Sequence, residues 1–269
     1  MAIKTSGDSK SKMIGVATVE VSDRAMTVCQ FQDDDNFTEL EGLIVQQGPK
    51  EILIPESADY ANIQKVGSRC GALISLRKIS EFSSENLAQD LNQLLEWKPG
   101  QAQNSSALPE MRLTTATGAL HALIKYLELS ANESNFNQFA LTTVEPKRFV
   151  HVDTSSAKAL GLISVQTSAV QQSLVAFLDK CRTPQGRRLL TQWVKQPLRD
   201  MRVITERQDI ISALTGDPEL RMALSEEHLK RFPDLQLLAR KLQKKNSSLQ
   251  DLFKYKQRNC ILITCVLGD

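Results

Sequence analysis

The segment Cys181–Leu198, with the sequence CRTPQGRRLLTQWVKQPL, constrains the fold of this chain more than any other segment. Thr183 is a preferred helix N-cap, and Pro184 follows it at the first helical position, where the missing N–H costs nothing. Gly186 leaves room for close approach in the first turn. The segment therefore predicts a capped helix that begins at Pro184.

The same helix has one apolar edge and a defined exit. Its apolar residues recur at helical spacing, which is typical of a face that packs on a core. They are Leu189, Leu190, Trp193 and Val194. We expect Trp193 to fill the core, so that Trp193→Ala costs about 3–5 kcal/mol. Gln196, Pro197 and Leu198 end the helix and form the segment that leaves it (the helix exit), because the residue before a proline avoids helical geometry.

Basic residues gather around this helix. They are Arg187, Arg188, Lys195, Arg199 and Arg202. Ion pairs between helices and contacts to nucleic-acid phosphates are the two interpretations of this group. Interleaved aromatic residues are nearly absent, which disfavours a stacking platform for single strands. Arg207 falls inside the apolar stripe of the next helix, where we expect a buried or half-buried ion pair that fixes helix register.

The composition is that of an ordinary globular protein, with 269 residues, of which 41% are hydrophobic and 24% charged. This length is sufficient for two domains. No apolar run approaches the ~18 residues of a membrane span, and no N-terminal segment has the pattern of a secretion signal. The five cysteines lack C-x-x-C spacing, which favours reduced thiols in the cytosol or nucleus.

Charge divides the chain into two halves. Residues 1–144 contain 12 basic and 18 acidic side chains, whereas residues 145–269 contain 21 and 13. Such asymmetry is typical of two domains with different partners. The basic half could face nucleic acid or an acidic protein surface, or it could consist of solvated helix faces.

The first half predicts an α/β fold, a mixed sheet with flanking helices. We expect residues 1–12 to form a flexible polar tail, followed by a hairpin of Met13–Val19 and Thr27–Phe31. Further strands at 51–54 and 72–76 alternate with helices. The expected helices span residues 36–47, 58–68, 84–96 and 108–129. Asn36 is the expected cap of the first helix, and the acidic run at 33–35 indicates a solvated turn rather than a cation site.

The second half predicts an all-α segment. An apolar stripe runs from Val170 to Cys181, and Asp200 is the expected cap of the helix after the signature helix. A turn at residues 215–218 starts a further helix, and a final helix pair spans residues 235–257. The domain boundary falls within residues 132–150.

No catalytic pattern is complete. The chain lacks the G-x-x-x-x-G-K-[ST] loop that cradles phosphates, so we expect no ATP hydrolysis. The hairpin resembles the opening of ribonuclease-H-like folds, whose nucleases need several carboxylates around two metal ions. Glu20 and Asp23 are available near the first strand, but the later strands end without an evident partner acid. The sequence therefore predicts no metal and no cofactor in this chain.

Residues 173–198, with Ile204, Arg207 and Ile211, are similar to the start of the core (lever) region of the MutS family of DNA mismatch repair proteins. Residues 152–162 resemble the strand and turn that lead into that region. Other stretches resemble the eukaryotic MutS homologue two group within the family. These stretches are residues 48–51, 89–95, 108–111 and 231–235.

The resemblance implies that residues 13–140 form the MutS connector domain (domain II), a ribonuclease-H-like fold without nuclease activity. Residues 145–257 would form the N-terminal part of the core/lever domain (domain III). The resemblance also implies a structural signature rather than a catalytic site. That signature consists of Thr183, Pro184, Gly186, Arg187, Trp193, Gln196, Pro197, Leu198 and Arg207.

The resemblance to the eukaryotic group implies that the intact protein is a nuclear DNA-dependent ATPase that uses ATP and Mg²⁺. It would pair with MutS homologue six or three, bind mismatched double-stranded DNA and recruit MutL-type proteins. The resemblance ends after residue 257, and residues 258–269 have the composition of a divergent apolar tail. We therefore predict a mismatch-repair fragment that acts as a coupling and interaction module without an ATPase domain. A ribonuclease-H-like nuclease and a helical adaptor unrelated to repair are the alternatives.

Overall fold

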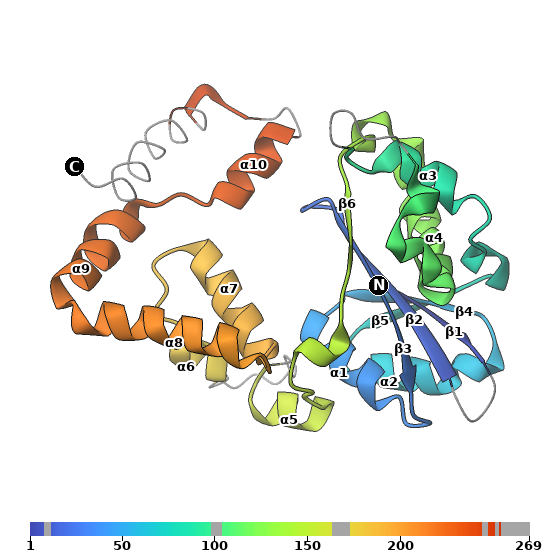
Figure 1. The fold of residues 1–269 in the computed structure, drawn as a ribbon, viewed down its shortest axis with the longest axis horizontal. Coiled ribbons are helices and arrows are strands. Elements are labelled where there is room, and N and C mark those ends of the chain that lie inside the picture. The colour runs from blue at the N-terminus through green and yellow to red at the C-terminus, as the bar shows by residue number, and fades with distance from the viewer. Residues whose placement is uncertain (8–11, 98–103, 163–172, 244–246, 251–252, 254–269) are drawn as a thin grey trace. The chain divides into compact units, whose positions relative to one another are not determined.

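The computed structural model describes residues 1–7, 12–97, 104–162, 173–243, 247–250 and 253. These residues form two compact units, drawn in Figure 1. The first unit contains residues 1–147 and 151–159, and the second contains residues 148–150, 160–162 and the described residues from 173 onward. The predicted order, an α/β domain followed by a helical segment, is confirmed.

A six-stranded mixed sheet, in the order β5-β4-β1-β2-β3-β6, is the frame of the first unit (Figure 1). Its strands are β1 (Ala2–Ser6), β2 (Lys12–Glu20), β3 (Ala25–Asp33), β4 (Glu51–Pro55), β5 (Leu73–Arg77) and β6 (Ala140–Thr143). Strands β1, β2 and β3 pair antiparallel, while β4, β5 and β6 join their neighbours in parallel. The predicted hairpin is confirmed as β2 and β3, with Arg24 in the turn at φ 52°.

The predicted flexible tail at residues 1–12 is wrong over residues 2–6, while residues 8–11 lie outside the described residues. Residues 2–6 form β1, which lies inside the sheet between β4 and β2. Ala2 and Ile3 are 0% exposed, each on a different face of the sheet. The mostly polar composition of this stretch did not predict a strand. Its two apolar residues, Ala2 and Ile3, become buried only because β2 and β4 pair with β1 on either side.

Helices cover both faces of this sheet (Figure 1). They are α1 (Thr38–Gln47), α2 (Ala61–Arg69), α3 (Leu87–Leu94) and α4 (Thr114–Tyr126). A further helix of this unit, α5 (Thr154–Ala159), packs against α1. Short 3-10 turns lie between these elements. They are η1 (Ala58–Tyr60), η2 (Ile79–Phe82), η3 (Ser105–Ala107), η4 (Pro109–Arg112), η5 (Leu129–Ala131), η6 (Glu133–Asn135) and η7 (Pro146–Arg148).

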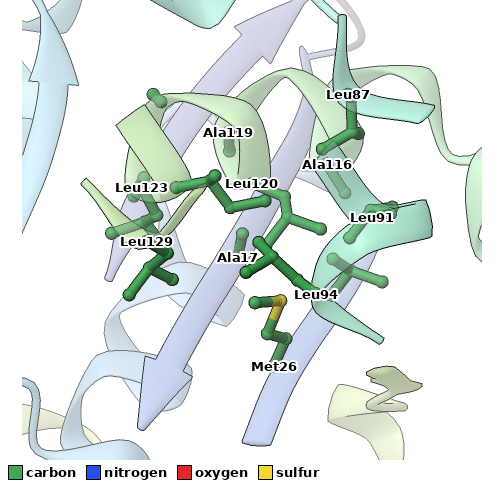
Figure 2. Close-up of a cluster of buried hydrophobic side chains, with 14 of the residues drawn as sticks. Ala17, Met26, Leu87, Leu91, Leu94, Ala116, Ala119, Leu120, Leu123 and Leu129 are labelled. Atoms are coloured by element: carbon green, nitrogen blue, oxygen red, sulfur yellow. The ribbon is translucent and has the colours of Figure 1, made fainter. Parts of the chain in front are cut away.

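Two apolar clusters hold these layers together. Figure 2 shows the cluster between the sheet and helices α3 and α4, in which Leu91 and Leu120 face Ala17 and Met26. A Cβ on Gly15 would lie 2.3 Å from the backbone N of Ala116, so α4 can cross β2 only over a glycine. The second cluster fills the opposite face beneath α1 and α2. It includes Ile3, Ile14, Leu40, Ile44, Ile52, Ile54 and Ile63.

The start of α1 explains the acidic run before it. The Asp33 carboxylate accepts hydrogen bonds from the N–H groups of Glu39 and Leu40, at 3.1 and 2.8 Å, and Asp34 accepts from Thr38 at 3.0 Å. These carboxylates satisfy helix donors that have no intrahelical partner. The predicted cap, Asn36, is wrong, because the N-cap position is Phe37, a buried core residue at φ 58°.

The second unit is helical. Its elements are α6 (Leu174–Leu178), α7 (Pro184–Lys195), α8 (Met201–Gly216), α9 (Pro218–Met222), the π-helical turn η8 (Ala223–His228), the 3-10 turn η9 (Leu229–Arg231) and α10 (Leu235–Gln243). Asp200 caps α8 as predicted, and Asp217, within the predicted turn, caps α9. Part of the predicted stripe at 170–181, most of the final helix and the segment 258–269 lie outside the described residues.

The predicted core stripe of α6 is wrong where the structure describes it. Phe177 is 78% exposed and Leu178 44% exposed. Among the described hydrophobic residues of this unit, Leu162 and Leu238 are buried. None of the described helices is both long and apolar enough to cross a bilayer.

Candidate interaction site around helix α7

Helix α7 begins as the sequence predicts. The Thr183 hydroxyl accepts a hydrogen bond from the Gly186 N–H at 3.1 Å, and Pro184 occupies the first helical position. A Cβ on Gly186 would lie 3.0 Å from the Thr183 Oγ1 atom, so a side chain here would crowd the cap. The glycine thus permits the close approach that its position suggested, although the group approached is the capping hydroxyl.

The exit of α7 forms a contact that the sequence did not predict. Val150 donates its N–H to the Pro197 carbonyl at 2.8 Å, and Phe149 pairs with Leu198 in an antiparallel bridge. The Arg199 N–H donates to the Arg148 carbonyl at 3.3 Å. The residues of the Gln-Pro-Leu exit therefore hold an extended segment that lies far away in sequence. The β-rich pattern of residues 148–152 was the available signal for this pairing.

The prediction that Trp193 fills the core is wrong in this structure, since the side chain is 38% exposed. The Arg207 guanidinium lies 3.6 Å from the centroid of the Trp193 ring. A planar guanidinium on an indole face is a cation–π contact, which tolerates partial hydration. Arg207 is half-buried as expected, but its neighbour is an aromatic ring rather than a carboxylate. The contact joins α8 to α7.

Ion pairs account for three arginines around α7. The Arg188 guanidinium donates two hydrogen bonds to the Asp234 carboxylate, at 2.8 and 2.7 Å, and so ties α7 to the start of α10. Arg187 pairs with Asp179, which follows α6. The third pair joins Arg182, just before α7, to Glu226. For Arg187 and Arg188, two of the five residues of the predicted basic group, these contacts support the ion-pair interpretation over the phosphate interpretation.

Two of these carboxylates have perturbed acidities. The hydrogen bonds from Arg188 lower the pKa of Asp234. The backbone N–H of Cys181 lowers the pKa of Asp179, with a further contribution from Arg187. Both groups favour the charged form in the folded chain. Burial and the neighbouring Asp179 raise the pKa of the Cys181 thiol, which makes it a poor nucleophile at neutral pH.

The segment between the two units has its own anchors on the first unit. His151 Nε2 donates to the Thr38 carbonyl of α1 at 2.7 Å. The Thr154 hydroxyl lies 3.3 Å from the Cys70 Sγ atom, directly after α2. Thr154 also donates its N–H to the Glu41 carboxylate at 3.4 Å. Residues 151–154 are thus fixed to α1 and α2, while residues 148–150 pair with the exit of α7.

The candidate nuclease acids lie at the β2–β3 turn. Glu20 is exposed and accepts a hydrogen bond from the Ser22 hydroxyl at 2.8 Å. Asp23 lies in the same turn. In the part of the chain that the structure describes, no group of three or more His, Cys, Asp or Glu side chains is placed to hold a metal ion.

Family comparisons agree with this two-unit arrangement. Residues 1–140 match MutS domain II, and residues 155–266 match MutS domain III. The chain belongs to the MutS family. The match to domain II includes residues 2–6, so β1 belongs to the matched domain instead of to a tail ahead of residue 13. The domain III match continues to residue 266, into the segment 258–269 that we expected to diverge.

Curated relatives of this MutS chain carry mismatch repair names. It is 38% identical over 264 residues to DNA mismatch repair protein spellchecker 1 of Drosophila melanogaster, covering 96% of this chain and 28% of the relative. It is 34% identical over 266 residues to msh-2 of Neurospora crassa, with the same coverages of 96% and 28%. It is 31% identical over 271 residues to MSH2 of Saccharomyces cerevisiae, covering 91% and 28%. The chain spans little more than a quarter of these relatives, and their names support a piece of a MutS homologue two.

Proposed function

We propose that this chain supplies domain II and the first part of domain III to a mismatch-recognition subunit in DNA mismatch repair. The observation that carries the proposal is the succession of both family domains in one chain that is 31–38% identical to proteins named for mismatch repair. Because this chain spans 28% of such a relative, the activity of the whole subunit rests on other domains as well.

Within that subunit the chain acts as a connector and lever rather than as an enzyme. The segment 148–154 supports this role, since Val150 is bonded to the α7 exit and the next residue, His151, is bonded to α1. Because Val150 and His151 are adjacent in the chain, we infer that a displacement of one anchored residue is transmitted directly to the other. Of the nine signature residues, Pro197 and Leu198 hold the helical side of this connection, and we assign a structural role to all nine.

The proposed partners follow from the family. The intact subunit pairs with MutS homologue six or three in the nucleus, binds mismatched double-stranded DNA with ATP and Mg²⁺, and recruits MutL-type proteins. This chain contributes protein contacts and holds no cofactor of its own. Arginines that are already ion-paired, such as Arg188 with Asp234, are less available to bind phosphates. We therefore expect other parts of the subunit to supply most of the DNA affinity.

Binding experiments on the full chain test this proposal. The tagged chain is mixed with purified MutS homologue six, MutS homologue three and a MutL-type protein, and co-purification is measured. Anisotropy of labelled matched and mismatched duplexes measures DNA binding. We expect capture of at least one of these proteins, with weak, salt-sensitive DNA binding that does not distinguish the duplexes.

Two outcomes contradict the proposal. Failure to bind any of the three proteins indicates a helical adaptor unrelated to repair. Mg²⁺- or Mn²⁺-dependent DNA cleavage that is lost in Glu20→Gln or Asp23→Asn indicates a nuclease. Glu56→Gln is the matched control, because Glu56 is another exposed acid of the first unit and lies outside the β2–β3 turn.

A further inference from the structure

The two edges of the sheet differ in what they expose. At the β6 edge, the exposed residues Ala140, Thr142 and Thr143 are small or polar. The β5 edge exposes two leucines, Leu73 at 65% and Leu76 at 49%. An edge strand presents unpaired backbone groups, and folded proteins usually protect it with charge or with a covering segment. Among the described strands, β5 has a neighbour on one side only.

The hydrogen bonds to β4 show which backbone groups of β5 point outward. Leu73 donates its N–H to the Lys50 carbonyl at 3.0 Å, and the Arg77 carbonyl accepts from Glu56 at 2.8 Å. In a parallel ladder, alternate residues bond to the same neighbour, so Ser75 also faces β4. The N–H and C=O groups of Ile74 and Leu76 therefore face away from the sheet.

We propose that β5 pairs antiparallel with β5 of a second copy of this chain, about a twofold axis at Ser75. In this register Ile74 of one copy lies opposite Leu76 of the other. Both residues form hydrogen-bonded pairs, so the outward N–H and C=O groups of Ile74 and Leu76 are satisfied in both copies. Ser75 lies opposite its own symmetry mate as a non-hydrogen-bonded pair. In every other antiparallel register about a twofold axis, Ile74 or Leu76 lies opposite a residue outside this pair.

The side chains are also self-complementary in this register. Ile74 lies on the α2 face, where its Cδ1 atom fills the space beside Gly67. Leu76 shares that face because side chains alternate along a strand. The two copies therefore bring two isoleucines and two leucines together on one face. On the other face Leu73 lies opposite Arg77 of the second copy, whose aliphatic stem can cover it.

Electrostatics do not oppose this pairing. Arg77 is the charged residue within β5, and it pairs with Glu81 of its own chain at 2.9 Å and lies over the Tyr126 ring at 5.2 Å. The twofold register places Arg77 opposite an apolar residue, so like charges are not directly opposed. This association is independent of the proposed role in mismatch repair.

The mass of the full chain at increasing concentration, measured by sedimentation, tests the proposal. We expect the parent chain to move from monomer to dimer. Leu76→Pro removes an outward N–H without removing a bond to β4, so it should return the chain to monomer. Thr143→Pro is the matched control, because it changes an outward-facing position on the β6 edge and should leave the dimer intact. A parent chain that stays monomeric, or a dimer that survives Leu76→Pro, overturns the proposal.

Cross-linking tests the register itself. Ser75→Cys places two thiols on the twofold axis, where the Cα atoms of a non-hydrogen-bonded pair lie about 4.5 Å apart, within disulfide range. Lys78→Cys is the control, since the same register separates those positions by about 20 Å. We expect mild oxidation to link the Ser75→Cys chains into a dimer through a 75–75 peptide found by mass spectrometry. A 75–75 link that forms no faster than a 78–78 link overturns the register, and capture of a different protein by the β5 edge in place of the second copy overturns the proposal.

Discussion

The ring of His151 occupies the space that a side chain at Gly42 would need, because a Cβ on Gly42 would lie 2.2 Å from the His151 Cδ2 atom. The same ring donates from Nε2 to the Thr38 carbonyl at 2.7 Å, so the proton must reside on that nitrogen. A glycine in the middle of α1 weakens the helix. Here it makes room for the residue that anchors the interdomain segment.

Gly42 and His151 should therefore be energetically coupled. Gly42→Ala raises helix propensity by about 1 kcal/mol, but it also displaces the His151 ring. We expect the full gain only in a His151→Ala background, with a coupling of about 1 kcal/mol between the two positions. Urea unfolding followed by the fluorescence of Trp97, in chains that all carry Trp193→Phe, measures the cycle in the first unit. Equal effects of Gly42→Ala in both backgrounds would show that the ring and the glycine act independently.

The contact between Arg207 and Trp193 predicts a modest coupling. Because Trp193 is 38% exposed, Trp193→Ala should cost well below the ~3–5 kcal/mol of a fully buried aromatic residue. A double-mutant cycle of Trp193→Leu and Arg207→Leu should give about 0.5–1 kcal/mol of coupling in the stability of the second unit. Circular dichroism during urea unfolding measures the loss of the helices of the second unit. A coupling of zero would show that the cation–π contact does not stabilise this unit.

The pairing of Arg188 with Asp234 predicts a pH-dependent stability. The pKa of Asp234 is lowered in the folded chain, so the contribution of this pair is present above the ordinary aspartate value, about 3.9, and is lost as the pH falls through the folded value. Arg188→Gln should be less stable than the parent at neutral pH, with the difference disappearing in acid. Arg199→Gln is the control, because that side chain is exposed and lies outside the ion pairs described above. A difference that persists unchanged in acid would contradict the assignment.

The cap of α7 predicts a stability effect that depends on a hydroxyl oxygen. Thr183→Ala removes the acceptor for the Gly186 N–H and should cost about 1 kcal/mol, whereas Thr183→Ser should retain most of the stability. Thr191→Ala is a suitable comparison, since the Thr191 hydroxyl bonds the Arg187 carbonyl within the same exposed helix and caps nothing. Equal losses in the serine and alanine variants at position 183 would exclude the capping role.

Local signals were sufficient for most elements and their ends. The Thr-Pro pair predicted the start of α7, and the predicted end of the first helix at residue 47 is confirmed for α1, where Gly48 follows at φ 57°. Both depend on a few neighbouring residues, whose preferences act within one turn. The cap of α1 was predicted at Asn36 and is provided by Asp33 and Asp34, because the carboxylates reach past the intervening residues to the first turn.

By itself the sequence determined the order of an α/β unit and a helical unit, the hairpin, the caps of α7 and α8, the turn that starts α9, and the resemblance to MutS. Periodicity identifies a face that can be buried, but it does not identify the segment that covers it. Only the tertiary structure placed β1 inside the sheet, exposed Trp193 beside Arg207, and joined Val150 to the α7 exit. These features depend on residues far apart in the chain, and such pairings are decided by packing and hydrogen bonding rather than by local preference.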